Sequence, residues 1–105
     1  MAVVERTGYR PNLIALGHRR IAHVAGVKRA LSASHRINGY QDALREAGIP
    51  IVDELIQAGD FSMESGAAAM ERLLDLAQPP TAVFAGNDEM AFGAMSVARV
   101  RGGGN

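Results

Sequence analysis

Three side chains suited to binding a small molecule follow the ends of predicted strands. Arg36 lies near the start of a helix beyond the first apolar run, and its guanidinium can donate two parallel hydrogen bonds to vicinal hydroxyls or a carboxylate. Phe61 follows the second run and carries an aromatic face suited to stacking, although the residues alone favour a place in the core. Asn87 follows the third run, and its amide can both donate and accept. Each also has an ordinary structural role, as a solvated helix residue, a core aromatic and a helix N-cap respectively.

Two aspartates adjoin these positions. Asp60 comes at the end of the second apolar run, where a carboxylate can hydrogen-bond a polar ligand, imitate a phosphate-accepting aspartate or cap the following helix. Asp88 follows Asn87 directly and can cap the third helix in its place. We therefore treat Asp60 and Asp88 as secondary candidates for the same site.

Signatures of catalysis, cofactor binding and metal binding are absent from the sequence. The three histidines, His18, His23 and His35, include no pair at the i, i+4 spacing that presents two imidazoles on one helix face, and there is no cysteine. The Gly-x-Ser-x-Gly, Gly-x-Gly-x-x-Gly and Gly-x-x-x-x-Gly-Lys-Ser/Thr motifs do not occur. We therefore expect a protein that is not an enzyme and that holds neither a cofactor nor a metal ion.

The elements that must position these residues alternate between strand and helix. Three apolar, β-rich runs are each followed by a segment with helical spacing; the runs cover residues 21–26, 54–59 and 81–86, and the helical segments cover residues 34–47, 62–76 and 88–99. Ser62 offers an N-cap to the second helix, and Asn87 with Asp88 offers one to the third. Residues 5–14 can form an additional short helix, broken at Pro11.

This alternation predicts the fold class. Continuous apolar strands indicate burial on both faces of a parallel sheet, so we expect an α/β protein with an open doubly wound parallel sheet in the order β-α-β-α-β-α. In such a sheet, ligands lie beyond the carboxyl ends of the strands, where loops lead into helices. Arg36, Phe61 and Asn87 all project from that edge, so we expect them to converge.

Composition places the chain with ordinary single domains. Its 105 residues, 48% hydrophobic and 21% charged, suffice for one core but not for two lobes with a cleft between them. The first 36 residues hold seven Lys/Arg against one acid, and the remainder holds four against ten, a basic end that fits either nucleic-acid contact or solvated strand ends. With no run long enough to span a bilayer and no signal-like start, we expect a cytoplasmic protein without a membrane partner.

Four short motifs stand at the ends of the predicted strands. They read Leu-Gly-His-Arg-Arg-Ile-Ala at 16–22, Arg-Ile-Asn-Gly-Tyr-Gln-Asp-Ala-Leu at 36–44, Gly-Asp-Phe-Ser-Met-Glu-Ser-Gly at 59–66, and Pro-Thr-Ala-Val-Phe-Ala-Gly-Asn-Asp-Glu-Met-Ala at 80–91. Each is weak alone, but the four in this order and spacing resemble the LacI/GalR family of bacterial transcriptional regulators. The resemblance runs from about residue 16 to residue 95, roughly four fifths of the chain.

The resemblance implies a domain organisation. Residues 16–101 would be the C-terminal subdomain of the family's effector-binding core, which shares its fold with periplasmic sugar-binding proteins. Residues 1–15 resemble the end of a helix-turn-helix domain and its hinge, joined directly to that subdomain. The chain therefore resembles a truncated or internally deleted family member, and we expect residues 102–105 to be a frayed tail.

The resemblance also implies residue roles and partners. Arg36, Phe61 and Asn87 would contact a sugar or purine effector, and weakly, because only one wall of the cleft is formed. Phe92 and Met95 on the third helix would lie at a homodimer interface. Operator DNA would be a partner only of a full-length member. Two alternatives remain: a sugar-binding transport component with the same fold, and a small flavodoxin-like enzyme or phospho-receiver domain.

Overall fold

The structure is a computed structural model that describes residues 3–5 and 12–101 of the chain. These residues form a parallel sheet of four strands: β1 (Val3–Glu5), β2 (Ile21–Ala25), β3 (Ile56–Ala58) and β4 (Ala82–Ala85). The strands lie in the order β1-β4-β2-β3, and each neighbouring pair is parallel. β2 and β4 are the inner strands, and their burial on both faces explains their continuous apolar runs.

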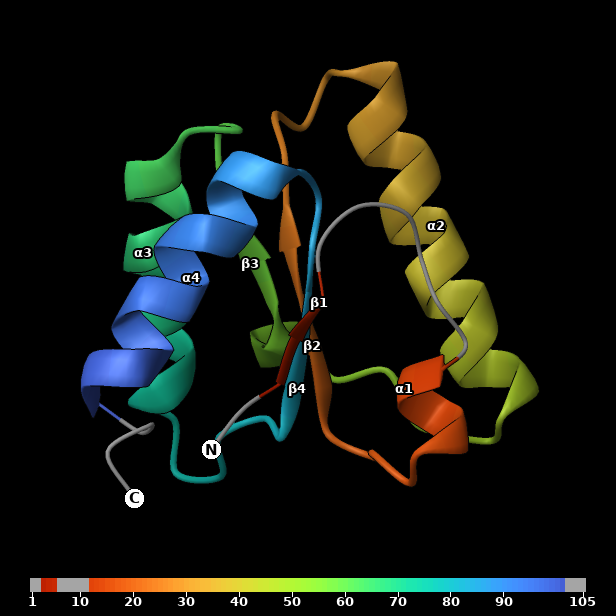
Figure 1. Cartoon of the computed structure of the whole chain (residues 1–105). Helices are drawn as coiled ribbons and strands as arrows, with labels where there is room; N and C mark the ends of the chain where they lie inside the picture. Colours follow the sequence, from red (N-terminus) through yellow and green to blue (C-terminus); the bar gives the residue numbers. More distant parts are fainter. Residues whose placement is uncertain (1–2, 6–11, 102–105) are drawn as a thin grey trace.

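Helices cover both faces of this sheet (Figure 1). α1 (Asn12–Ala15) and α2 (Leu31–Glu46) lie on one face, and α3 (Met63–Leu74) and α4 (Asp88–Arg101) lie on the other. Strand and helix alternate from β2 to α4. The predicted open doubly wound α/β sheet is therefore confirmed.

The N-terminal region differs from the sequence-based prediction. We expected a short helix over residues 5–14, but Glu5 lies in β1, which pairs with β4, and α1 begins only at Asn12. A strand of three residues is too short to show an alternating or continuous apolar pattern. The intervening residues 6–11 of the predicted helix and hinge, and the predicted tail at 102–105, lie outside the described residues.

Element boundaries also differ from the predictions in three places. A 3-10 turn, η1 (Asp53–Leu55), replaces the first part of the predicted second strand. α2 begins at Leu31, three residues earlier than expected. Its N-cap residue, Ala30, makes no side-chain capping bond, so the sequence carries no capping signal at that position. α3 ends at Leu74, two residues before the end of the predicted helical segment, so Leu76 lies just beyond the helix and is half-buried.

α3 and α4 pack against each other without intervening side chains at two points. A Cβ atom added at Gly66 would lie 2.2 Å from the carbonyl oxygen of Met90, and one at Gly93 would lie 2.0 Å from the carbonyl oxygen of Met63. Glycine is the residue that permits such an approach between backbones. The pair of helices is therefore matched in shape at the level of the main chain.

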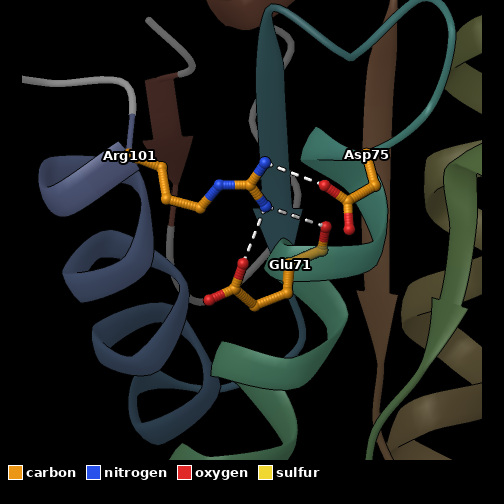
Figure 2. A network of polar contacts seen from close by, with 3 residues as sticks. All are labelled: Glu71, Asp75 and Arg101. Carbon is orange, nitrogen blue, oxygen red and sulfur yellow. Dashed lines mark hydrogen bonds and ion pairs between the residues drawn. The ribbon is translucent and has the colours of Figure 1, made fainter.

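An ion-pair network joins the same two helices near the end of α4 (Figure 2). The Arg101 guanidinium donates to Oε1 of Glu71 at 2.7 Å and to Oδ1 of Asp75 at 2.8 Å. These hydrogen bonds, with the two negative charges, raise the pKa of Arg101 above its ordinary value. The guanidinium thus holds the last turn of α4 against the C-terminal turns of α3.

The opposite face of the sheet is built around a buried histidine. The His23 ring stacks between Tyr40 and Phe84, with ring centroids 5.2 Å and 4.9 Å away. Its Nδ1 donates to the carbonyl oxygen of Phe84 at 2.8 Å, which fixes the Nδ1–H tautomer and leaves Nε2 buried without a partner among the described residues. Burial lowers the pKa of His23 from 6.5 to about 4. His23 is therefore a neutral core residue.

Candidate functional site

The carboxyl edge of the sheet brings together loops that follow three strands. β2 lies between β4 and β3, so the loops after β3 and β4 can meet only across the end of β2. They do meet there: Nδ2 of Asn87, just after β4, donates to the carbonyl oxygen of Phe61, in the loop after β3, at 2.9 Å. The predicted convergence is therefore found for Phe61 and Asn87.

Phe61 has an unusual backbone conformation. Its φ of 75° is the only positive φ among the described non-glycine residues, and the left-handed region is disfavoured for a bulky side chain. The ring lies against Gly26 at the end of β2, where an added Cβ would be 2.0 Å from Cε1 of Phe61. Phe61 is half-buried and packs on the α3–α4 side of the core. It thus combines its predicted structural role with a place at the sheet edge.

Asn87 caps α4. Its Oδ1 accepts a hydrogen bond from the backbone N–H of Met90 at 2.9 Å, which confirms the capping role offered by the sequence. One donor and one acceptor of the amide are therefore used within the chain. Contact between Asn87 and an effector stays a prediction.

The turn before α3 is ordered by Asp60 and two serines. Oδ1 of Asp60 accepts from the backbone N–H of Ser62 at 2.9 Å, and the backbone N–H of Asp60 donates to Oγ of Ser65 at 3.0 Å. Ser62 also caps α3, as predicted, by accepting from the backbone N–H of Ser65. The hydroxyl and the backbone N–H of Ser62 hold the pKa of the Asp60 carboxyl below its usual range. Asp60 is exposed and ionised, and it shapes the loop that carries Phe61.

Asp88 is the first residue of α4. Its Oδ1 is buried and has no hydrogen-bond partner within the described part of the chain, while the residue as a whole is half-buried. The positive end of the helix dipole favours a carboxylate in this position. Asp88 therefore does not take over the capping bond, which Asn87 makes.

Arg36 lies on α2, which covers the face of the sheet opposite α3 and α4 (Figure 1). It is half-buried on α2, and its charge is the smallest of three contributions to the pKa of His23. Arg36 has no hydrogen bond to Phe61 or Asn87 in the structure. A cavity of about 380 Å³ lies near it between α2 and the edge strand β3, and its lining consists of Ala25, Gly26, Lys28, Ala33, Ser34, Ile37, Ile56, Gln57 and Ala58. None of the predicted site residues lines this cavity.

α4 also carries the residues predicted for a dimer interface. Four of its apolar side chains, Met90, Ala91, Ala94 and Ala98, are buried by the sheet and α3. Phe92 remains 44% exposed, and Met95 is half-buried. Much of the apolar surface of α4 is thus covered within the chain, and Phe92 and Val100 are the large apolar side chains that stay exposed on this helix.

Two residues of this region were missed by reasoning from sequence. Gly26 receives the Phe61 ring, and Met90 both donates the capping bond and contacts the Gly59 and Gly66 positions. Gly26 ends the first apolar run, which is the one signal that marks it as a position of close approach. No local pattern indicates which loop would lie against it.

Metal-binding clusters and membrane-spanning helices are both absent from residues 3–5 and 12–101. No group of three His, Asp or Glu side chains in those ranges is placed to hold a metal ion. None of the helices described there has the length and apolar character needed to cross a membrane.

The fold and its edge define a class of protein: a parallel α/β layer with aromatic and polar loop residues at the carboxyl ends of its strands, where small molecules bind in such sheets. The family described as "Periplasmic binding proteins and sugar binding domain of LacI family" matches residues 5–103. The chain belongs to this family and corresponds to part of the effector-binding domain of a LacI-type transcriptional regulator.

Curated relatives are whole regulators that are much longer than the matched region. The HTH-type transcriptional repressor CytR of Escherichia coli (strain K12) is 48% identical over 86 residues, which is 82% of this chain and 25% of the repressor. Catabolite control protein A of Priestia megaterium is 41% identical over 92 residues, which is 87% of this chain and 28% of that protein. The chain thus spans about a quarter of the length of these relatives, which are regulators and not enzymes.

Solved structures agree with this assignment. A regulatory protein of the LacI family from Chloroflexus aggregans superposes with a TM-score of 0.84 at 41% identity, covering 88% of this chain and 34% of that chain. The transcriptional regulator CelR, solved as a cellobiose complex, superposes with a TM-score of 0.84 at 43% identity, covering 88% of this chain and 28% of that chain. The resemblance seen in the four sequence motifs is therefore confirmed at the level of family and fold.

Proposed function

We propose that this chain forms one wall of the effector-binding site of a LacI-type regulator and takes a sugar or purine effector. The observation that carries the proposal is the junction of Phe61 and Asn87 across the end of β2, where a ligand of an open α/β sheet is expected. Arg36 would approach the same ligand from α2, with a fork of donors suited to vicinal hydroxyls. As part of a bacterial regulator, the chain would act in the cytoplasm.

Relatives support the sugar class. One of them, CelR, was solved with cellobiose, and the matching family description names a sugar-binding domain. Operator binding is an activity of whole regulators, of which this chain matches about a quarter, so we assign it only to a longer member. A single wall makes about half of the contacts of a closed cleft, so we expect dissociation constants in the order of millimolar.

The test is a titration of the purified chain with cellobiose and with adenine, followed by NMR of backbone amides. We expect saturable shifts of residues at the carboxyl edge with one of the two ligands. Phe61→Ala and Arg36→Ala should abolish these shifts, whereas Arg45→Ala, which removes an exposed arginine paired with Asp42 on the same helix, should not. The proposal fails if neither ligand shifts these amides, or if binding is unchanged in both site variants.

We further propose that the chain self-associates through α4, with Phe92 and Met95 in the interface. Exposure of 44% of Phe92 supports this placement. Phe92→Glu should convert a dimer to a monomer in light scattering, because it places a charge in an apolar seam. Leu31→Glu is the matched control, since Leu31 is 71% exposed at the start of α2 on the other face. A monomeric parent chain, or a dimeric Phe92→Glu variant, would remove α4 from the interface.

A further inference from the structure

The loop after β3 holds Phe61 in a conformation that its own chemistry does not favour. A φ of 75° places a bulky aromatic residue in the left-handed region, where glycine and asparagine are the usual occupants. Such a conformation persists only where surrounding contacts determine it. The contacts that hold Phe61 in this conformation therefore indicate the role of its ring.

One of these contacts comes from outside the loop. Within the loop, Oδ1 of Asp60 accepts from the backbone N–H of Ser62, so Phe61 is the central residue of an Asx turn. From outside, Nδ2 of Asn87 donates to the carbonyl oxygen of Phe61 at 2.9 Å, over a separation of 26 residues. Asn87 is thus the side chain that ties the peptide of Phe61 to another part of the fold.

The orientation of the Asn87 amide leaves no choice of partner. Oδ1 faces the backbone N–H of Met90, and Nδ2 faces the carbonyl oxygen of Phe61. Exchanging the two atoms would place a donor against a donor and an acceptor against an acceptor, so the hydrogen-bond pattern determines the assignment. The first turn of α4 therefore aims the amide at Phe61.

This arrangement fixes three strand ends relative to one another. The Phe61 peptide after β3 is bonded to Asn87 after β4, and the Phe61 ring lies against Gly26 after β2, where a Cβ would come within 2.0 Å of Cε1. Any rotation of the Phe61 backbone out of the left-handed region would move the ring away from Gly26. The hydrogen bond from Asn87 thus acts directly on the position of an aromatic face at the sheet edge.

We propose that Asn87 is a positioning residue that holds the Phe61 ring against Gly26 and so presets the aromatic face on which a sugar or purine ring stacks. This inference rests on the effector-binding function proposed above. A preset ring lowers the ordering entropy that a ligand must otherwise overcome, so the contribution of Asn87 to binding runs through Phe61. It differs from the direct contact expected from sequence, because one donor and one acceptor of the amide are already engaged.

Asn87→Asp and Asn87→Ser separate the two bonds of this residue. Aspartate and serine both remain good N-caps, so the bond from Met90 and the start of α4 should persist. Neither replacement supplies the donor to Phe61: an ionised aspartate carries only acceptors, and the serine side chain is shorter. Glu89→Gln, at an exposed position in the same turn, is the matched control because it changes the charge and neither bond.

The readout is the ring position itself, observed by NMR in the full chain. In the parent and in Glu89→Gln we expect NOEs between the Phe61 ring and the α-protons of Gly26, with those protons shifted upfield by the ring. In both Asn87 variants the NOEs and the upfield shift should be lost, while the Met90 amide stays protected from hydrogen exchange. A variant that keeps the Gly26 signature overturns the proposal, and so does one that loses the Met90 protection together with it, because Asn87 would then be a cap alone.

A titration with cellobiose and adenine completes the test. If the parent responds to one of them, Asn87→Ser should bind it more weakly by a factor close to that of Phe61→Ala, and binding unchanged from the parent would overturn the positioning role. If the parent responds to neither, the proposed effector site fails. The Gly26 signature still decides whether Asn87 positions the ring in that case, so the two failures are distinguishable.

Discussion

The helices pack on the two faces of the sheet in different ways. On the α3–α4 face, glycines allow helix backbones to touch, with the carbonyl oxygens of Met63 and Met90 where side chains would otherwise lie. On the α1–α2 face, bulky rings fill the space around His23, and an open cavity of about 380 Å³ remains beside α2. The first face is sensitive to added volume and the second to added charge. Phe61 packs on the first face and Arg36 lies on α2 over the second, and we predict that both reach an effector at the carboxyl edge.

The largest expected effect comes from adding one methyl group to the close-packed face. Gly93→Ala would place a Cβ 2.0 Å from the carbonyl oxygen of Met63 and 2.8 Å from the backbone nitrogen of Ala67, so the helices must separate. We expect a loss of roughly 3–4 kcal/mol in the free energy of unfolding, measured by urea denaturation.

The same substitution on the other face should have the opposite sign. Gly39 lies within α2 and a Cβ there meets nothing within 4 Å, so Gly39→Ala should stabilise the chain by about 0.5–1 kcal/mol through helix propensity. Equal destabilisation by the two alanines would refute the contrast between the faces. It would mean that the α2 face is packed as tightly as the α3–α4 face.

The second effect is a pH dependence located on the α1–α2 face. Burial lowers the pKa of His23 to about 4 from 6.5, so between these values the unfolded chain binds a proton that the folded chain does not. Stability is then fully present above pH 6.5 and falls as the pH is lowered towards 4. From pH 7.5 to pH 5 this single group should remove about 2 kcal/mol from the free energy of unfolding.

Denaturation curves at several pH values check this expectation. His23→Gln removes the titrating group, so its stability, although lower overall, should change less between pH 7.5 and pH 5 than that of the parent. Titration of the His23 ring followed by NMR gives the pKa directly. A parent and variant with the same pH dependence would show that the buried ring is not the source.

Much of the fold is readable from the sequence because its signals are local. The apolar runs that became β2 and β4 are continuous, and Ser62 and Asn87 cap the helices that they were expected to begin. β1 was missed because three residues show no pattern, and its place beside β4 depends on pairing with residues almost 80 positions away.

The candidate site was only partly readable, for the same reason. Strand order places Phe61 and Asn87 at one edge, but their hydrogen bond requires a left-handed backbone at Phe61. A phenylalanine in the sequence does not indicate that conformation. Gly26 has a role only because a ring from another loop lies on it. Contacts between loops depend on tertiary structure, and a single sequence does not encode them in any short spacing.

The smallest effect tests the ion pairs that close the α3–α4 face. Arg101→Met removes the hydrogen bonds to Glu71 and Asp75 while keeping much of the side-chain volume. All three side chains are at least partly exposed, so solvent weakens the attraction, and we expect a fall of about 2–4 °C in the melting temperature at low salt. Arg45→Met on α2 breaks a single pair to Asp42, at 3.2 Å and more exposed, and should lower it by less. Because the Arg101 effect is electrostatic, raising NaCl to 1 M should shrink the difference from the parent. A difference that persists at high salt would instead assign the contribution of Arg101 to packing of its aliphatic part against α3.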